Sequence, residues 1–154
     1  MNAPMQAPFT PADVEALARS LASGPQKMWI AGQAVDSASG QTFDTFNPST
    51  GELLAKVASA GAEDVDRAVK AARSALEGPW SKLPGGERTK LLWKLADLIE
   101  ANAVNLALLE SMDNGKPFGM ALFVDMPMAV QALRYFAGWA DKLRGDSPQP
   151  SAPG

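Results

Sequence analysis

The segment FGMALFVDMPMAVQALRYFAGWADKL, residues 118–143, says most about the kind of fold this chain adopts. Its apolar residues fall on two adjacent stripes at helical spacing. Only four of its residues carry charge: Asp125, Arg134, Asp141 and Lys142. A helix that is apolar around most of its circumference is normally buried inside a larger protein. We therefore expect a helix over residues 118–143 that needs neighbours on several sides.

Two residues interrupt the apolar pattern of this segment. Pro127 has no backbone N–H, and a proline in a helix interior costs about 3 kcal/mol unless a bend accommodates it. We therefore expect the helix to kink or break there. Asp125 lies on an otherwise apolar helix, where a carboxylate needs a polar partner or water. A structural role and a position in a water-filled channel both remain open for Asp125.

Three further helices are predicted upstream, within residues 62–112. The first ends at Gly78-Pro79. Its apolar stripe consists of Val65, Ala68, Val69, Ala72 and Leu76. The second begins near Glu87, and the third covers residues 103–112 and stops at the turn sequence of residues 113–117. In that turn, Asp113 is expected to be a turn-forming side chain that closes the helix.

Residues 27–60 are typical of β-structure. A short hairpin is predicted over residues 28–35, with a tight turn at Gly32. A second hairpin pairs residues 42–46 with residues 53–57 across the turn Asn47-Pro48-Ser49-Thr50-Gly51. Isolated hairpins of this size are marginally stable, so both need a larger body to pack on.

The two ends complete the predicted organisation. Thr10 and Pro11 are typical of a helix start, and Ser23-Gly24-Pro25 stops that helix. The chain is thereby divided into an arm helix (1–26), β-hairpins (27–60), a helical layer (61–145) and an extended tail (146–154). The fold class is α+β, mostly helical with two N-terminal β-hairpins.

Composition excludes several classes of chemistry. The 154 residues contain neither Cys nor His, which removes thiol nucleophiles, imidazole bases and zinc sites built on either. Neither the dinucleotide-binding pattern G-x-G-x-x-G nor the P-loop pattern G-x-x-x-x-G-K-[ST] occurs in the sequence. The net charge of −3 argues against nucleic-acid or anionic-membrane partners. No apolar run approaches the ~20 residues of a membrane helix, and no secretory signal is visible, so a cytoplasmic protein is expected.

The acidic residues Glu63, Asp64 and Asp66 have two interpretations. They are either a carboxylate cluster for a divalent ion or solvated acids that the helix dipole favours in a first turn. We favour solvated acids.

Basic and aromatic residues further along also have two interpretations each. The basic residues Lys82, Arg88, Lys90 and Lys94 are interspersed with acids, which favours a solvated face over a phosphate-binding patch. The aromatic residues between positions 134 and 139 have helical spacing, which favours the core over an aromatic ligand cage.

Five blocks of sequence resemble the opening of the aldehyde dehydrogenase superfamily. They occur in family order and span about residues 27–146. The blocks are residues 47–52 (NPSTGE), 63–73 (EDVDRAVKAAR), 88–100 (RTKLLWKLADLIE), 109–117 (LESMDNGKP) and 134–142 (RYFAGWADK). Within the superfamily, the segment 124–143 resembles bacterial phenylacetaldehyde-type dehydrogenases. The resemblance implies the N-terminal part of an aldehyde-dehydrogenase-like α/β fold, with most of the Rossmann sheet outside this sequence.

The resemblance also implies the function expected of the complete enzyme. Such enzymes oxidise an aldehyde to a carboxylic acid with NAD or NADP, and a Cys thiolate forms the covalent intermediate. Because this sequence has no Cys, we expect an N-terminal fragment that is inactive alone, with no catalytic or cofactor-binding residue of its own. Its expected partners are the remainder of the dehydrogenase or subunits of a homo-oligomer, and an aldehyde substrate in the complete enzyme. The alternative is a non-catalytic binding or scaffolding module that reuses the helical layer.

Two peripheral sites follow from the resemblance. Asp113, with the backbone carbonyls of Thr45 and Phe46, matches positions that hold a monovalent cation in relatives, and oxygen ligands suit such a hard ion. Asp125 and Met128 match positions that line the substrate entrance tunnel, and Val124 is a further candidate.

Overall fold

The computed structural model describes residues 10–22 and 24–142. The predicted tail (146–154), residues 1–9 of the arm and the last residue of the predicted helix 118–143 lie outside these ranges. The elements are, in order, α1 (Pro11–Ala22), β1 (Met28–Ile30), β2 (Gln33–Val35), β3 (Thr42–Phe46), β4 (Leu53–Ala58), α2 (Ala62–Leu76), α3 (Pro79–Lys82), α4 (Gly85–Ala101), α5 (Ala103–Asn114), α6 (Phe118–Met120), the π-helical turn η1 (Ala121–Asp125) and α7 (Met126–Ala137).

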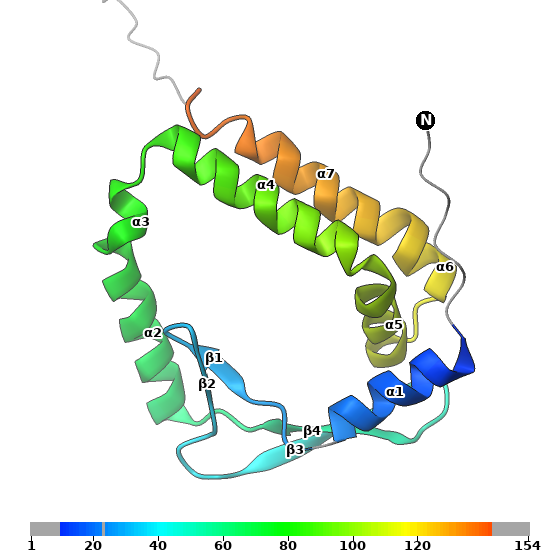
Figure 1. Ribbon diagram of the computed structural model, residues 1–154. Helices are drawn as coiled ribbons and strands as arrows, with labels where there is room; N and C mark the ends of the chain where they lie inside the picture. The colour runs from blue at the N-terminus through cyan, green and yellow to red at the C-terminus, as the bar shows by residue number, and fades with distance from the viewer. Residues whose placement is uncertain (1–9, 23, 143–154) are drawn as a thin grey trace, which may run out of the picture.

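Figure 1 shows these elements arranged around the rim of an open frame. One side is formed by α4 and α7, which pack along each other. Another side is formed by α2 and the short α3, and the strands with α1 complete the frame. The β1–β2 hairpin contacts α2, whereas α1 contacts β4 and α5. The predicted α+β class, mostly helical with two N-terminal hairpins, is confirmed.

Both predicted hairpins are present as separate antiparallel sheets. In the first, Met28 pairs with Val35, and the turn has positive φ at Ala31 (54°) and Gly32 (75°). In the second, Thr42 pairs with Ala58. Its turn closes with Gly51, whose φ of 75° is a conformation that glycine adopts without steric cost. The described strands form two separate two-stranded antiparallel sheets, and an isolated parallel bridge pairs Gln26 with Val57.

The helix boundaries differ from the expected ones near the prolines. The helix α2 ends at Leu76, and Pro79 then begins the short helix α3, which the sequence pattern did not predict. Proline suits a first helical turn because the N–H that it lacks has no partner there anyway. Pro84 precedes α4, which therefore starts at Gly85, two residues before the expected Glu87.

Of the kink or break expected at Pro127, the structure excludes the break. The chain stays helical, but the turn from Ala121 to Asp125 is π-helical, and α7 begins directly after it. A proline ring collides with the carbonyl four residues earlier in a regular α-helix. Phe123 holds that carbonyl and lies inside the wider π turn, whose hydrogen bonds span five residues. The chain therefore does not break at Pro127, and a π turn directly precedes the proline.

The core is small and lies mainly where α4, α5 and α7 meet. Its largely small residues are Ala96, Ala107, Leu108, Met112, Ala121, Val130 and Ala137. A second group, Leu54, Ala55 and Ala58, is buried on β4. Small side chains let α4 and α7 approach closely, and Thr89 adds a hydrogen bond of 2.8 Å from its hydroxyl to the carbonyl of Ala137.

Much of the apolar surface is uncovered by the described residues. The stripe predicted on α2 exists, but Val65 is 55%, Val69 52% and Leu76 70% exposed. The aromatic residues expected in the core are also exposed; Tyr135 is 62% and Phe136 65% accessible. The expectation of a buried aromatic cluster is therefore wrong for this chain. Among residues 10–22 and 24–142, no helix is long and apolar enough to cross a membrane.

Candidate functional site

The end of α5 is shaped by Ser111 and Asn114 rather than by Asp113. Gly115 has a φ of 77° and caps the helix, with its N–H donating to the carbonyl of Ser111 at 3.0 Å. The side-chain oxygen of Asn114 accepts from the N–H of Lys116 at 2.8 Å, and the Ser111 hydroxyl donates to the Lys116 carbonyl at 2.7 Å. Asp113 is exposed. The expectation that Asp113 closes this turn is therefore wrong.

Asp125 has the polar partner that its apolar surroundings demand. Lys116 Nζ lies 2.5 Å from Asp125 Oδ2, and the two side chains are 37% and 29% exposed. The pair joins the loop after α5 to the end of η1. Its hydrogen bond raises the pKa of Lys116 above the usual range, outweighing the opposite effect of partial burial. This ion pair gives Asp125 a structural role, and its position in a water-filled channel stays a prediction.

The other tunnel candidates flank Asp125 on the same helical segment. Val124 is half-buried, and Met128 is 62% exposed. Residues three or four positions apart on a helix are neighbours, which places Met128 one turn from both. The structure therefore brings all three candidates together.

A groove of about 380 Å³ runs beside this segment, between α4, α5 and α7. Asp113 lines it from α5, opposite Met126 and Ala129 from the start of α7. The remaining lining residues are Ile99, Leu106, Leu109 and Glu110. The exposed carboxylate of Asp113 thus shares a mainly apolar groove with the segment that carries the tunnel candidates.

Thr45 and Phe46 lie in β3, at the position where its pairing with β4 shifts register. The Thr45 hydroxyl donates to the carbonyl of Ala55 at 3.3 Å. The turn after β3 abuts the loop after α5, because a Cβ at Gly115 would lie only 3.0 Å from Pro48 Cγ. The two segments that carry the cation candidates are therefore neighbours. No group of three or more His, Cys, Asp or Glu residues that could hold a metal occurs in the described part of the chain.

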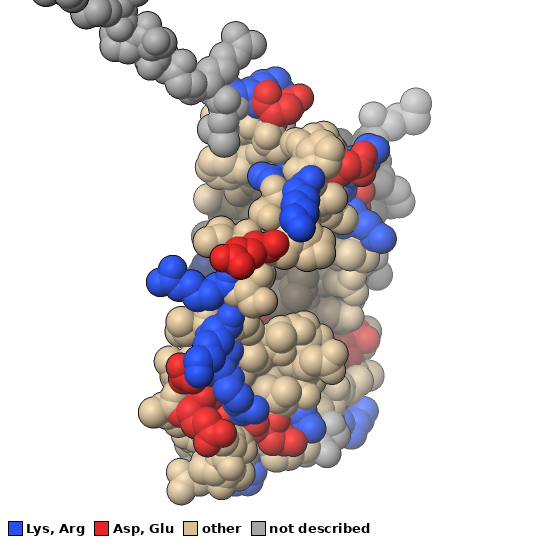
Figure 2. All heavy atoms as spheres, turned by 90° about the vertical axis from the view of Figure 1, so that its left-hand side faces the viewer, with Lys and Arg blue, Asp and Glu red and all other residues tan. Residues whose placement is uncertain are grey.

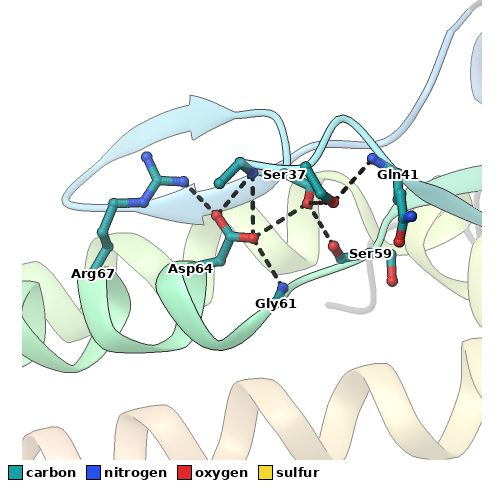
Figure 3. Close-up of polar contacts among 8 residues, drawn as sticks. Ser37, Gln41, Ser59, Gly61, Asp64 and Arg67 are labelled. Atoms are coloured by element: carbon teal, nitrogen blue, oxygen red, sulfur yellow. Dashed lines mark hydrogen bonds and ion pairs between the residues drawn. The ribbon is translucent and has the colours of Figure 1, made fainter.

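Asp64 is a site that the sequence interpretation missed. It was expected in solvent, yet its side chain is only 1% exposed. Figure 3 shows its carboxylate between α2 and the loop after β2. It accepts from the N–H groups of Gly61 and Ala38, both at 3.0 Å, and from Arg67 at 2.5 Å. Ser37 Oγ lies 3.2 Å away and donates to the carbonyl of Ser59 at 2.6 Å.

These contacts favour the charged form of Asp64. The N–H of Gly61 has the largest effect and Arg67 the next, and together with Ala38 and Ser37 they lower the pKa of Asp64 from 3.8 to about 2 despite its burial. An acid in the third position of a helix commonly reaches back to the N-cap N–H, so the contact with Gly61 was available from spacing. The contacts with the loop at residues 37–38 were not. Glu63 and Asp66 are exposed, as expected.

Lys82, Lys90 and Lys94 are exposed, as the sequence interpretation expects, whereas Arg88 is half-buried. Figure 2 shows basic and acidic side chains intermixed on the face formed by α2 and α3. Lys90 pairs with Glu87 at 2.7 Å, and Lys70 pairs with Asp66 at 2.7 Å. Arg88 lies over the ring of Trp80, 5.7 Å from its centroid.

The comparisons with known proteins agree on one family. The profile described as "Aldehyde dehydrogenase family" matches residues 34–154. The mitochondrial aldehyde dehydrogenase family 2 member B4 of Arabidopsis thaliana is 52% identical over 120 residues, which cover 77% of this chain and 22% of that protein. The mitochondrial benzaldehyde dehydrogenase of Antirrhinum majus is 51% identical over 120 residues, with the same coverage of 77% and 22%.

A solved structure supports the same match. The NAD⁺ complex of an aldehyde dehydrogenase from Bacillus cereus is 46% identical and aligns with a TM-score of 0.82, covering 93% of this chain and 28% of that one. The chain thus spans about a fifth of the length of the curated relatives that it matches.

Proposed function

The chain belongs to the aldehyde dehydrogenase family, and from this premise we propose that it is the N-terminal part of an enzyme that oxidises an aldehyde to a carboxylic acid with NAD or NADP. Its fold matches the N-terminal part of the aldehyde dehydrogenase fold. The relatives support the substrate class and the cofactor, since one is named for benzaldehyde and another binds NAD⁺. The choice between NAD and NADP and a cytoplasmic location stay predictions.

The role of this chain in that enzyme is to form a helical layer that packs on other parts of the protein. The observation that carries this proposal is the exposed apolar stripe of α2, with Val65, Val69 and Leu76 more than half accessible. Water-exposed apolar surface of this extent is unfavourable, so it indicates a face that is covered in the functional state. A further layer of the dehydrogenase, or another subunit, supplies that cover.

No step of the oxidation is assigned to the residues of this chain. It has no Cys for a thiolate nucleophile, and its glycines do not form a phosphate-binding pattern for a dinucleotide. The residues present therefore do not fit the cofactor. In the complete enzyme NAD(P)⁺ accepts the hydride from the aldehyde, at a site built by other residues. The chain on its own is inactive.

The chain's contribution to chemistry is peripheral. Asp113 and the backbone carbonyls of Thr45 and Phe46 hold a monovalent cation; the support is their all-oxygen donor set and the contact between the loops that carry them. Asp125, Met128 and Val124 line the entrance through which the aldehyde reaches the reaction centre. Their place on one helical segment, with Met128 62% exposed, supports that role.

The proposal is tested with a chimera. The segment of the Bacillus cereus enzyme that corresponds to residues 34–154 is replaced by those residues of this chain, and NADH formation from benzaldehyde and from propanal is followed at 340 nm. The chimera is expected to form NADH, whereas the purified 154-residue chain is expected to form none with either aldehyde. A folded chimera without activity, or turnover by the purified chain alone, would contradict the proposal.

A further inference from the structure

The groove between α4, α5 and α7 has an apolar end and an acidic end. Four of its lining residues belong to α5, namely Leu106, Leu109, Glu110 and Asp113. They occur at positions i, i+3, i+4 and i+7, so they share one face of this helix. From Leu106 to Asp113 the helix rises about 10 Å, at about 1.5 Å per residue. The leucines therefore line the groove towards the start of α5, and the carboxylates line it towards the end.

The remaining lining residues of the groove are apolar. Ile99 belongs to α4, and Met126 and Ala129 belong to the first turn of α7. All three are half-buried. Small-molecule sites in proteins commonly have volumes of about 300–1,000 Å³ and are lined by apolar side chains with a few polar groups. The volume of this groove, about 380 Å³, and its lining match that description.

The two carboxylates of the groove form no ion pair in the described part of the chain. Glu110 accepts a hydrogen bond of 2.6 Å from the neutral side-chain amide of Asn114. The ion pair of Lys116 is formed with Asp125, whose hydrogen bond is the main cause of the raised pKa of Lys116, and the charge of Glu110 makes a smaller contribution. Asp113 is exposed. Because one cation faces three carboxylates, this corner of the molecule is negative.

The carboxylates also lie at the end of α5 that disfavours acids. The C-terminal end of a helix carries a partial negative charge, which favours nearby cations and disfavours nearby carboxylates. The last turn of α5 contains no basic residue, although Asp113 lies within it and Glu110 directly precedes it. The helix end and the two carboxylates therefore favour a cation at the acidic end of the groove.

We propose that this groove binds a small-molecule primary amine that carries an alkyl or aryl group. Its ammonium group contacts Glu110, and its apolar group contacts Leu106 and Met126. An inorganic cation would neutralise the carboxylates but leave the apolar lining in water, whereas an arylalkylamine covers both ends of the groove. The proposed function gives Glu110 no role, so this site is additional to the cation site proposed at Asp113.

The contribution of charge to this binding follows from Coulomb's law. An ammonium group about 5 Å from the Glu110 carboxylate, at an effective dielectric constant of about 50 to 80, binds on the order of four- to tenfold more tightly than an uncharged group. Salt screens this contribution, because the Debye length shrinks from about 10 Å at 0.1 M to about 3 Å at 1 M ionic strength. Apolar contacts in the groove depend on neither the sign of the ligand's charge nor this screening.

Binding is measured with the 154-residue chain, labelled with ¹³C at its methionine methyl groups. The signal of Met126 reports on the groove, and that of Met28 in β1 reports on a separate part of the fold. Both are assigned by their loss in Met126→Leu and Met28→Leu. Three ligands of the same shape are titrated at pH 7: 4-phenylbutylamine, the uncharged 4-phenylbutanol and the anionic 4-phenylbutanoate.

The amine is expected to shift the Met126 signal saturably and to leave the Met28 signal in place. At low salt its Kd should be four- to tenfold below that of the alcohol, and the anion should bind more weakly than the alcohol. At 1 M salt the three values of Kd should approach one another.

Three variants separate the charge from the apolar lining. Glu110→Gln keeps a side-chain oxygen for Asn114 and removes the charge, so the Kd of the amine should rise four- to tenfold while that of the alcohol stays within about twofold. Glu63→Gln is the matched control, because this exposed carboxylate on α2 does not line the groove. It should leave all three values unchanged. Leu106→Ala should weaken all three ligands by a similar factor, about two- to fivefold.

The outcomes of the titration decide between a ligand site and a bare acidic surface. Equal affinities of the three ligands, or a preference for the amine that survives Glu110→Gln or 1 M salt, would overturn the role of charge. A Met126 signal that does not move up to about 10 mM amine would overturn the site itself.

The alternative occupant is another layer of the complete dehydrogenase, and the same titration of the active chimera tests it. The Met126 signal is expected to shift there as well. If only the isolated chain binds the amine, another part of the enzyme covers the groove, and the inference is overturned while the dehydrogenase proposal stands. A folded but inactive chimera overturns the proposed function and leaves the binding measured with the isolated chain in force.

Discussion

The helix α2 and the pair formed by α4 and α7 differ in the kind of side chain that they bury. In the pair, small apolar side chains such as Ala96, Val130 and Ala137 are at most 4% exposed. In α2, the one fully buried side chain is the carboxylate of Asp64, and Val69 on its apolar stripe is 52% exposed. A hydrogen bond to the buried Asp64 attaches the first turn of α2 to the loop after β2. The helices α4 and α7 instead bury small apolar side chains against each other, and Arg134 of α7 adds exposed ion pairs to Asp97 and Glu100 of α4.

This comparison distinguishes the contacts that stabilise the chain by itself from the apolar surface that it leaves for another layer to cover. A helix held by polar contacts at one end keeps its orientation while its apolar face stays free. More than half of Val65, Val69 and Leu76 on that face stays in contact with water, so most of the stabilisation from burying them is gained only when another layer covers them. The following predictions test this difference, beginning with the largest effect.

A charge introduced into the α4–α7 contact should be far more costly than one on the α2 stripe. Val130→Asp buries a carboxylate without a partner, and we expect a loss of about 3 kcal/mol or more in the free energy of unfolding. Val69→Asp should change it by less than about 0.5 kcal/mol, because Val69 is already exposed. Urea unfolding of the isolated chain, followed by circular dichroism, measures both.

The effects of the same two substitutions on stability can also be compared in the chimera. There the α2 stripe is expected to be covered, so Val69→Asp should become strongly destabilising as well. Equal effects of the two substitutions in the isolated chain would contradict the division drawn between α2 and the α4–α7 pair.

Loss of the Asp64 carboxylate should loosen the attachment of α2. In Asp64→Asn, the N–H groups of Gly61 and Ala38 and the guanidinium of Arg67 lose a shared charged acceptor. We expect amide hydrogen exchange in residues 62–68 to become about tenfold faster. The control is Asp66→Asn, two residues further on, whose side chain is 58% exposed and forms an ion pair with Lys70. Similar exchange rates in the two variants would contradict the assigned role.

Acid should detach α2 before it separates α4 from α7. The pKa of Asp64 is lowered from 3.8 to about 2 in the folded chain, so its stabilising contribution is complete above pH 3.8 and is lost as the pH falls towards 2. Protection of residues 62–68 against exchange should decrease over this interval, and the decrease should be absent in Asp64→Asn. Between α4 and α7 the charged groups are Arg134 and the carboxylates of Asp97 and Glu100, which are 64% and 62% exposed. Exposed pairs of this kind contribute about 1 kcal/mol or less, so their protonation should leave the apolar packing of these helices in place. A uniform loss of protection in both regions would argue against this assignment.

The smallest effect is expected on the solvated face of α2. Lys70 and Asp66 form an exposed pair, with side chains 75% and 58% accessible. Pairs of this kind contribute about 0.5 kcal/mol or less. Lys70→Met should therefore leave the urea midpoint of the isolated chain within experimental error. A larger loss would show that the charged face of α2, as well as Asp64, holds this helix in place.

The sequence pattern predicted those parts of the fold that depend on local chemistry. The turn that ends at Gly51 and the glycine stop after α5 were both expected, and both glycines have positive φ. Periodicity also placed the apolar stripe on α2. It could not show that Val65 and Val69 lack cover, because periodicity identifies which residues share a face and not what lies opposite.

The candidate site was predicted only in part, for a similar reason. The apolar setting of Asp125 indicated that it needs a partner, but nothing local identified Lys116, nine residues earlier, as that partner. Asp113 was assigned to the helix-closing turn because of its residue type, and the neighbouring Asn114 closes it instead. The sequence predicted a kink or break at Pro127 but not a π turn. Several helical distortions relieve the clash between a proline ring and the carbonyl four residues earlier, so the sequence does not specify which one forms.

The amino-acid sequence alone established the family, the order of helices and hairpins, and the absence of a thiol or imidazole, because these follow from residue identity and short-range conformational preference. Only the tertiary structure established the burial of Asp64, the Lys116–Asp125 pair and the exposure of the α2 stripe. Each of these depends on which segments meet in space. A buried carboxylate and a solvated one have the same local sequence, and they differ only in the donors that the rest of the chain brings to them.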